Sequence, residues 1–244
     1  MINLYVMNVS PFEDSSLFSK GLALIDKERQ DKVNTLKHKE AQKLSLGAGL
    51  LLMFGLNYAL ETGTFKMASS EMKCSEKEQL QFIEFEADEL VSHLAITDNV
   101  KSFEYTYGEH GKPYIAGETP IFFSLSHSGE YVFLAVSDKE VGADIQKCKD
   151  ISFERTAKHF MTQGEYAQWS EESEEVQKEL FYQIWAGKEA YLKLTGEGMT
   201  AGFQTVYYDD DKQTIIDSRM PDKEVETFWG VLEGYQFAVC RIKE

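Results

Sequence analysis

Two segments in the second half of the chain carry side chains that could bind a divalent metal ion and a phosphate. In residues 141–146, apolar side chains alternate with others, which predicts a strand with Asp144 and Gln146 on one face. A later stretch with helical periodicity carries Glu189 and Lys193, and a spacing of four puts both on one stripe of a helix. Because carboxylate and amide oxygens suit Mg²⁺, the two segments together indicate a metal site placed against a phosphate.

The helical pair also has a purely structural interpretation. A Glu four residues before a Lys stabilises a surface helix by about 0.2–0.5 kcal/mol, and such pairs are common. The aromatic residues Phe181, Tyr182 and Trp185 fit a buried helix face. We favour the functional interpretation because the predicted strand presents Asp144 as a candidate partner for the helical pair.

Composition sets wider bounds on the protein. A chain of 244 residues with 43% apolar residues can form the core of one large domain or of two small ones. Glycines and an asparagine interrupt the longest apolar stretch, residues 44–60, so we expect no membrane-spanning helix. The N-terminus lacks a basic stretch followed by an apolar one, and we therefore expect a cytoplasmic protein. Three cysteines without Cys-x-x-Cys spacing argue against a disulfide framework and a structural zinc site.

Charge indicates the kind of ligand. The net charge of −16 argues against nucleic-acid binding, which depends on clustered Lys and Arg. Residues 20–43 are nevertheless locally basic, and a basic segment on an acidic protein suggests a small anionic ligand. A solvated helix face with paired charges is the alternative interpretation.

The two halves of the chain show a weak internal repeat. The triplet Lys39-Glu40-Ala41 recurs 149 residues later as Lys188-Glu189-Ala190, and a Gly-x-Gly follows each triplet at the same distance. Each half also begins with a strand pattern and ends in a similar β pattern. This order predicts an α+β protein of two similar α/β subdomains, residues 1–139 and 140–244, related by a pseudo-two-fold axis. Chance similarity of two amphipathic segments is the alternative.

The first half offers further groups for an anion. Lys112 precedes Pro113 in a predicted turn, and Ser126, His127 and Ser128 end a predicted strand with side chains that can donate to phosphate oxygens. Taken alone, these residues also fit an ordinary surface lysine and a hydrogen-bonded turn. A cleft between two subdomains would be a natural place for a ligand that uses them.

Taken together, the motifs resemble those of a known family, the Sfp-type 4′-phosphopantetheinyl transferases. Order, spacing and residue type agree over roughly 90 residues, and four separate motifs rarely coincide. The segments that carry the resemblance are Gly111-Lys112-Pro113, Ser124-Leu125-Ser126-His127-Ser128, Val141-Gly142-Ala143-Asp144-Ile145, and Trp185-Ala186-Gly187-Lys188-Glu189-Ala190-Tyr191-Leu192-Lys193 with Gly196-Glu197-Gly198.

The resemblance implies a fold, a substrate and a reaction. The fold would be that of the 4′-phosphopantetheinyl transferases, a monomer of two similar halves with coenzyme A and Mg²⁺ at their interface; Mn²⁺ is an alternative metal. The reaction would move the phosphopantetheine arm of coenzyme A onto a serine of an apo acyl or peptidyl carrier protein, and it would release 3′,5′-ADP. The resemblance implies no nucleic-acid or membrane partner. Residues 153–169, rich in aromatic residues, are a possible carrier surface, although a buried helix face explains them equally well.

The resemblance also assigns roles to residues of this chain. Asp144, Gln146 and Glu189 would bind the metal. Glu189 would also accept the serine proton, and Lys193 would approach the transferred phosphate. Further residues would contact coenzyme A; these are His127, Ser126, Lys112, Pro113 and Lys188, with Arg29, Lys32 and Lys43 from the basic segment.

Two other functions stay open at this level. One is a protein that binds coenzyme A or a carrier protein with little or no transferase activity, for which Gln146 is the sequence signal. Many Sfp-type members carry Asp-Ile-Glu where this chain has Asp144-Ile145-Gln146. The other is a Mg²⁺-dependent hydrolase of nucleotides or coenzyme A, in which Glu189 would activate water.

The neutral side chain of Gln146 generates a first prediction. Gln146→Glu adds the missing negative charge, so we expect this variant to bind Mg²⁺ more tightly than the wild type. The measurement is the Mg²⁺ concentration for half-maximal transfer. An unchanged or weaker response to Mg²⁺ would refute the expectation.

Overall fold

The chain forms two compact units, which we describe separately. The computed structural model describes residues 1–62, 80–97, 100–150, 153–198, 202–220 and 222–243. The first unit comprises Met1–Tyr105 with Ile115–Asp138, and the second comprises Thr106–Tyr114 with Lys139–Glu244. The division after Asp138 lies next to the expected subdomain boundary. Residues 106–114, which the sequence assigned to the first subdomain, belong to the second unit.

The first unit is built on a four-stranded sheet in the order β2-β1-β6-β5. Strand β1 runs parallel to β2 and antiparallel to β6, and β5 and β6 form an antiparallel hairpin. The strands are β1 (Ile2–Asn8), β2 (Leu80–Glu86), β5 (Phe122–Ser128) and β6 (Tyr131–Ser137). The two inner strands, β1 and β6, are buried along almost their whole length, which explains their nearly continuous apolar sequence.

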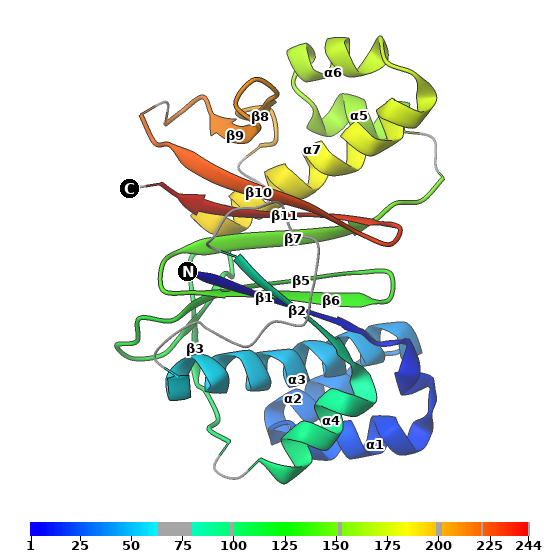
Figure 1. Cartoon of the computed structure of the whole chain (residues 1–244), viewed down its shortest axis with the longest axis vertical. Helices are drawn as coiled ribbons and strands as arrows, with labels where there is room; N and C mark the ends of the chain where they lie inside the picture. Colours follow the sequence, from blue (N-terminus) through cyan, green and yellow to red (C-terminus); the bar gives the residue numbers. More distant parts are fainter. Residues whose placement is uncertain (63–79, 98–99, 151–152, 199–201, 221, 244) are drawn as a thin grey trace. The chain divides into compact units, whose positions relative to one another are not determined.

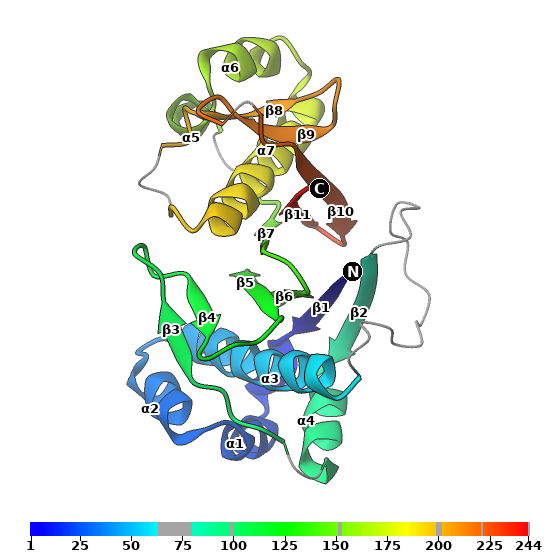
Figure 2. The same ribbon diagram turned by 90° about the vertical axis from the view of Figure 1, so that its left-hand side faces the viewer.

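Helices cover one face of this sheet. Helix α3 contacts β1, β5 and β6, and the shorter helices α1, α2 and α4 pack against α3 (Figure 2). Asp14 and Asp26 start α1 and α2 because their carboxylates accept backbone N–H groups that have no helical partner. The helical elements are η1 (Ser10–Glu13), α1 (Ser15–Leu24), α2 (Lys27–Thr35), α3 (Lys39–Thr62) and α4 (Ala87–Ile96).

The glycines that interrupt the apolar sequence of α3 let this helix approach the sheet closely. A Cβ atom at Gly47 would lie 2.6 Å from Cγ1 of Val9, and one at Gly55 would lie 2.9 Å from Cδ2 of Leu134. By length and composition alone, Lys39–Glu61 could also span a membrane, but 61% of the relevant window is buried in the first unit. Its apolar character is accounted for by the core that it forms with the sheet.

The second unit has a three-stranded antiparallel sheet in the order β10-β11-β7. Its strands are β7 (Val141–Lys147), β10 (Val225–Leu232) and β11 (Tyr235–Ile242). Helix α7 (Glu174–Thr195) lies across one face of this sheet, and α5 (Glu154–Phe160) and α6 (Gln163–Ser170) pack near its N-terminal half (Figure 1). Two short two-stranded hairpins are also present. One is β3 (Tyr105–Tyr107) with β4 (Pro113–Ile115), of which residues 106–114 belong to this unit; the other is β8 (Val206–Asp209) with β9 (Thr214–Asp217).

Gly142 on β7 allows α7 to lie directly on the sheet. A Cβ atom at this position would lie 1.9 Å from the carbonyl oxygen of Ala190 and 2.3 Å from the backbone nitrogen of Leu194. Helix α7 ends at Thr195, and the next residue, Gly196, caps it in a left-handed conformation with φ of 73°. The sequence predictions of a strand at 141–146 and a helix through 181–193 are therefore confirmed.

The α+β class is confirmed, but the proposed repeat spacing is wrong in detail. In each unit the first strand pairs antiparallel with the last strand of a closing hairpin, so β1-β6-β5 and β7-β11-β10 have the same order. The triplet Lys39-Glu40-Ala41, however, opens α3, whereas Lys188-Glu189-Ala190 lies inside α7. The common spacing of 149 residues therefore does not mark equivalent positions, because the preceding connections differ in length.

The close approach at Gly142 generates a stability prediction. Gly142→Ala places a methyl group against two backbone positions of α7 that cannot move aside, so the free energy of unfolding should fall by more than about 1–3 kcal/mol. Urea denaturation measures the change. The control is Gly164→Ala in α6, where a Cβ would meet nothing within 4 Å and should change stability by less than about 1 kcal/mol. Equal effects of the two substitutions would contradict this assignment.

Candidate active site on β7 and α7

Asp144 is the centre of a charged cluster on the second unit. It is 2% exposed, and one of its carboxylate oxygens pairs with Nζ of Lys193 at 2.6 Å. The amide of Gln146 donates to the other oxygen at 2.8 Å. The strand therefore presents Asp144 and Gln146 on one face, as its alternation predicted, and α7 supplies the basic partner.

Glu189 completes the cluster and has an unusual proton affinity. Burial, repulsion by Asp144 and a smaller opposing attraction by Lys193 combine to raise the pKa of Glu189 to about 7 from its ordinary value of 4.5. Two carboxylates therefore interact in a partly buried setting, and Lys193 is a positive side chain that attracts both. A pKa near neutrality suits a group that accepts a proton during a reaction.

The cluster fits a divalent cation. A cation between two carboxylates relieves repulsion of the kind that acts between Asp144 and Glu189, and the Lys193 ammonium already pairs with Asp144. Among the described residues, no three His, Cys, Asp or Glu side chains gather into a metal site. The available oxygen ligands are thus two carboxylates and the Gln146 amide, a set that suits Mg²⁺ with several retained waters.

Lys112 belongs to the same unit as the cluster. Its ammonium pairs with Glu140 and donates to the carbonyl oxygen of Leu194 at 2.9 Å. Pro113, the next residue, starts β4. These contacts attach the turn of the β3–β4 hairpin to the last turn of α7, just beyond Lys193. A contact of Lys112 or Pro113 with coenzyme A stays a prediction.

The prediction that Lys188 binds coenzyme A is wrong. Its side chain is fully buried, and its ammonium donates to the carbonyl oxygens of Phe160 and Phe203 and to Glu165. Three donors are thereby used, which leaves none for a phosphate. The sequence contained a signal for this outcome, because Lys188 lies four residues after Ile184 and three before Tyr191, both buried. That spacing places Lys188 on the core face of α7.

The remaining predicted ligands belong to the first unit. Ser126 and His127 lie on β5, the former buried and the latter exposed, and Arg29 and Lys32 lie one turn apart on α2. Lys43 is 5% exposed on α3 and pairs with the carboxylates of two exposed residues, Glu13 and Glu40. Phosphate binding by Lys43 would therefore require displacement of these carboxylates. The roles of all five residues stay predictions.

The aromatic segment at residues 153–169 is mainly core. Phe160, Met161 and Trp169 are between 2% and 4% exposed and belong to one hydrophobic core with Phe181 of α7. The structure thus favours the buried-helix interpretation over an apolar carrier surface.

Sequence reasoning missed two residues that fix the surroundings of the cluster. Glu165 on α6 binds the buried ammonium of Lys188. Arg219 pairs with Glu197, in the Gly196-Glu197-Gly198 segment, and with Asp217. Asp217 in turn accepts the hydroxyl of Tyr191 on α7 at 3.0 Å. No short-range spacing signals the pairs Glu165–Lys188 and Arg219–Glu197, because their partners lie more than 20 residues apart.

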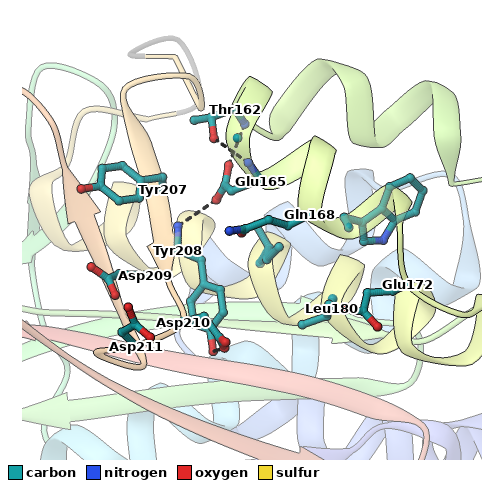
Figure 3. Close-up of a pocket in the computed structure, with 13 residues that line it drawn as sticks. Thr162, Glu165, Gln168, Glu172, Leu180, Tyr207, Tyr208, Asp209, Asp210 and Asp211 are labelled. Carbon is teal, nitrogen blue, oxygen red and sulfur yellow. Dashed lines mark hydrogen bonds between the residues drawn. The ribbon is translucent and has the colours of Figure 1, made fainter.

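A hollow of about 610 Å³ lies on the second unit beside α6 and the β8–β9 turn (Figure 3). Its lining includes Glu165, Trp169 and Tyr208, and the acidic run 209–211. None of the cluster residues Asp144, Glu189 and Lys193 lines it. The charged cluster, rather than this larger hollow, therefore carries the candidate chemistry.

Comparison with known proteins shows what the second unit is similar to. Residues 140–240 match the sequence model of the 4′-phosphopantetheinyl transferase superfamily, a range that contains β7, α7 and every residue of the charged cluster. The resemblance to Sfp-type 4′-phosphopantetheinyl transferases is thereby confirmed for the second unit.

Individual relatives carry the same description. The chain is 36% identical over 140 residues to 4′-phosphopantetheinyl transferase psf-1 of Bacillus pumilus, a match that covers 55% of this chain and 58% of that protein. It is 34% identical over 137 residues to 4′-phosphopantetheinyl transferase Sfp of Bacillus subtilis (strain 168), covering 54% and 60% respectively. The match thus spans less than two thirds of these relatives. The solved holo-[acyl-carrier-protein] synthase (AcpS) of Thermotoga maritima shares 15% identity at a TM-score of 0.34, covering 43% of this chain and 63% of that one.

The raised pKa of Glu189 generates a prediction on metal binding. A metal ligand must be deprotonated, and Glu189 gains its charge only as the pH rises through about 7. The affinity for Mg²⁺ or Mn²⁺ should therefore fall as the pH falls, by about tenfold between pH 8 and pH 6. Titration of the protein with Mn²⁺, followed by electron paramagnetic resonance, measures this affinity. Glu189→Gln should bind the metal more weakly and with a flatter pH dependence; an unchanged slope would exclude Glu189 as the titrating ligand.

Proposed function

We propose that this chain transfers the 4′-phosphopantetheine group of coenzyme A to a serine of an apo acyl or peptidyl carrier protein and releases 3′,5′-ADP. The observation that supports the proposal best is the cluster of Asp144, Glu189 and Lys193, in which Lys193 of α7 pairs with Asp144 of β7 and the charge of Asp144 helps to raise the pKa of Glu189. The superfamily match covers these elements, and relatives with 34% and 36% identity are named 4′-phosphopantetheinyl transferases.

The proposed reaction is a substitution at phosphorus. The serine oxygen forms a bond to the phosphorus that bears the pantetheine arm, and the bond from this phosphorus to the bridging pyrophosphate oxygen breaks. The electron pair leaves with 3′,5′-ADP, and the serine proton passes to Glu189. Charge grows on the phosphate oxygens and on the leaving oxygen, so groups that stabilise negative charge lower the barrier.

The residues of the cluster divide this task. Asp144 and Glu189, with Gln146 directly or through water, would hold Mg²⁺, which supplies positive charge to the phosphate oxygens. Glu189 has two carboxylate oxygens, so metal binding and proton acceptance can fall to one residue. Lys193, which pairs with Asp144 in this structure, would offer a point charge to the bridging or leaving oxygen.

Coenzyme A and the carrier would require groups beyond the cluster. We propose that Lys112, Ser126 and His127 contact the phosphates of coenzyme A, and that Arg29 and Lys32 add positive charge. The chain has a net charge of −16, so broad electrostatic steering toward an acidic carrier is unfavourable. Contact with such a carrier would therefore depend on local complementarity.

The experiment that tests the proposal uses a panel of apo carrier proteins with coenzyme A and Mg²⁺. Mass spectrometry of each carrier should show a phosphopantetheine adduct on serine, with one 3′,5′-ADP released for each adduct. Binding of coenzyme A without release of 3′,5′-ADP would indicate a binding protein. Hydrolysis of coenzyme A in the absence of any carrier would indicate a hydrolase.

The proposed role of Glu189 generates a prediction for its amide variant. Glu189→Gln removes the proton acceptor and a metal ligand at nearly constant volume, so turnover should fall at least roughly 100-fold while the protein stays folded. The measurement is steady-state transfer to one carrier protein, with circular dichroism as the test of folding. The matched control is Glu175→Gln on an exposed turn of the same helix, which should keep normal turnover. Near-normal transfer by Glu189→Gln would remove this residue from the mechanism.

A further inference from the structure

The buried ammonium of Lys188 joins three separate segments of the second unit. It donates to the carbonyl oxygen of Phe160 at the end of α5 (2.8 Å), to Oε2 of Glu165 (2.6 Å) and to the carbonyl oxygen of Phe203 beyond α7 (3.0 Å). The ammonium also lies 5.8 Å from the centre of the Phe160 ring. All three N–H donors of Lys188 are thus used inside the protein.

Glu165 extends the connection to two further segments. It is 6% exposed, and its Oε2 atom also accepts the backbone N–H of Thr162 at 2.6 Å, while Oε1 accepts that of Tyr208 on β8 at 2.8 Å (Figure 3). The hydroxyl of Thr162 accepts the backbone N–H of Glu165 in return, which makes a capping box at the start of α6. One ion pair therefore ties α5, α6 and β8 to the middle of α7.

Stability alone is a poor explanation for such a pair. The cost of removing two charges from water often exceeds their mutual attraction, and apolar replacements of similar volume are frequently as stable. Phe160 already packs its apolar ring against Phe181 of α7, and both share a hydrophobic core with Ile184. A fully hydrogen-bonded pair supplies something that apolar contacts lack, namely a fixed direction for one side chain of the helix.

The direction of the Lys188 side chain matters because the next residue on α7 is Glu189. Consecutive residues of an α-helix project about 100° apart, so a fixed side chain at Lys188 also fixes the directions of Glu189 and Lys193. On the sheet side, the backbone contact at Gly142 fixes the distance between α7 and β7. A rotation of α7 by about 10° would move a carboxylate that lies about 6 Å from the helix axis by about 1 Å, and a misplacement of that size can cost roughly 100-fold in rate.

We infer that Lys188 and Glu165 are positioning residues, whose buried ion pair holds α7 in the rotation that directs Glu189 and Lys193 toward Asp144. The inference rests on the proposed function for its kinetic consequence. Its structural part, the alignment of the carboxylates that would bind a metal, is testable without any transfer reaction.

The experiment replaces both partners, because a single change would leave a buried charge without its partner. The double variant Lys188→Met/Glu165→Gln keeps similar volumes, and the new amide oxygen at position 165 can still accept a backbone N–H. We expect this variant to fold, with kcat for transfer at least roughly 30-fold lower and KM for coenzyme A within about threefold of the wild type. The dissociation constant for Mn²⁺, measured by electron paramagnetic resonance, should rise about tenfold.

The control is a second ion pair on the same helix. Lys178 of α7 pairs with Asp150 at the surface, so Lys178→Met/Asp150→Asn removes an α7 pair that lies about three turns away from Glu189. This variant should keep wild-type kcat and Mn²⁺ affinity. If both double variants behave alike, the positioning role is overturned.

Further outcomes separate positioning from other causes. A folded Lys188→Met/Glu165→Gln variant with wild-type kcat and Mn²⁺ affinity would overturn the inference, and so would a loss of activity that matches the unfolded fraction. If that variant fails to fold, the test is Glu165→Gln alone, which removes the charge of the pair but keeps an oxygen acceptor for the Lys188 ammonium beside the carbonyl oxygens of Phe160 and Phe203. We then expect a fall in kcat and weaker Mn²⁺ binding at constant KM, and wild-type values would overturn the inference. If the wild type shows no transfer at all, the proposed function fails, and the Mn²⁺ affinities still decide the positioning role.

Discussion

The second unit depends on one steric constraint, the contact between the backbones of β7 and α7 at Gly142. Any larger side chain at this position would meet the carbonyl oxygen of Ala190 and the backbone nitrogen of Leu194. Because the helix can lie this close, short side chains from the strand and longer ones from the helix reach the same point. The ion pair of Asp144 with Lys193 at 2.6 Å, and the electrostatic coupling of Asp144 with Glu189, follow from that proximity.

Around this contact, ion pairs and hydrogen bonds attach α7 to the neighbouring elements of the unit. Glu165 and Lys188 attach the middle of α7 to α5, α6 and β8, while Lys112 attaches its last turn to the β3–β4 hairpin by donating to the carbonyl oxygen of Leu194. Arg219 holds Glu197 just beyond the helix, and Asp217 holds Tyr191 on it. The helix that carries the candidate catalytic residues is therefore bound to its surroundings at its middle and at its C-terminal end. Such rigid support is what a site with closely spaced charges requires.

The sequence predicted the elements of this site better than their connections. Alternation over residues 141–146 and helical spacing through Glu189 and Lys193 are local properties, so the strand, the helix and the shared face of Asp144 and Gln146 followed from them. Lys188 was misassigned because a lysine beside a catalytic motif suggests a phosphate ligand, although its buried helical neighbours indicated the core. Glu165 could not be predicted, since its partner lies 23 residues away and only the packing of α6 on α7 brings them together. The repeat spacing failed for a similar reason, because matching triplets occupy different turns of α3 and α7.

The ion pair between Asp144 and Lys193 affects how the charge of the site is balanced when the protein folds. When two carboxylates lie close together, their mutual repulsion destabilises the folded state unless a cation lies near them. Here the chain itself supplies a cation, the ammonium of Lys193, which lies one helical turn after Glu189 and pairs with Asp144. The negative charge of Asp144 is therefore offset within the folded chain by a covalently attached ammonium group. Lys193 is thus a counter-ion for Asp144 that the chain itself supplies.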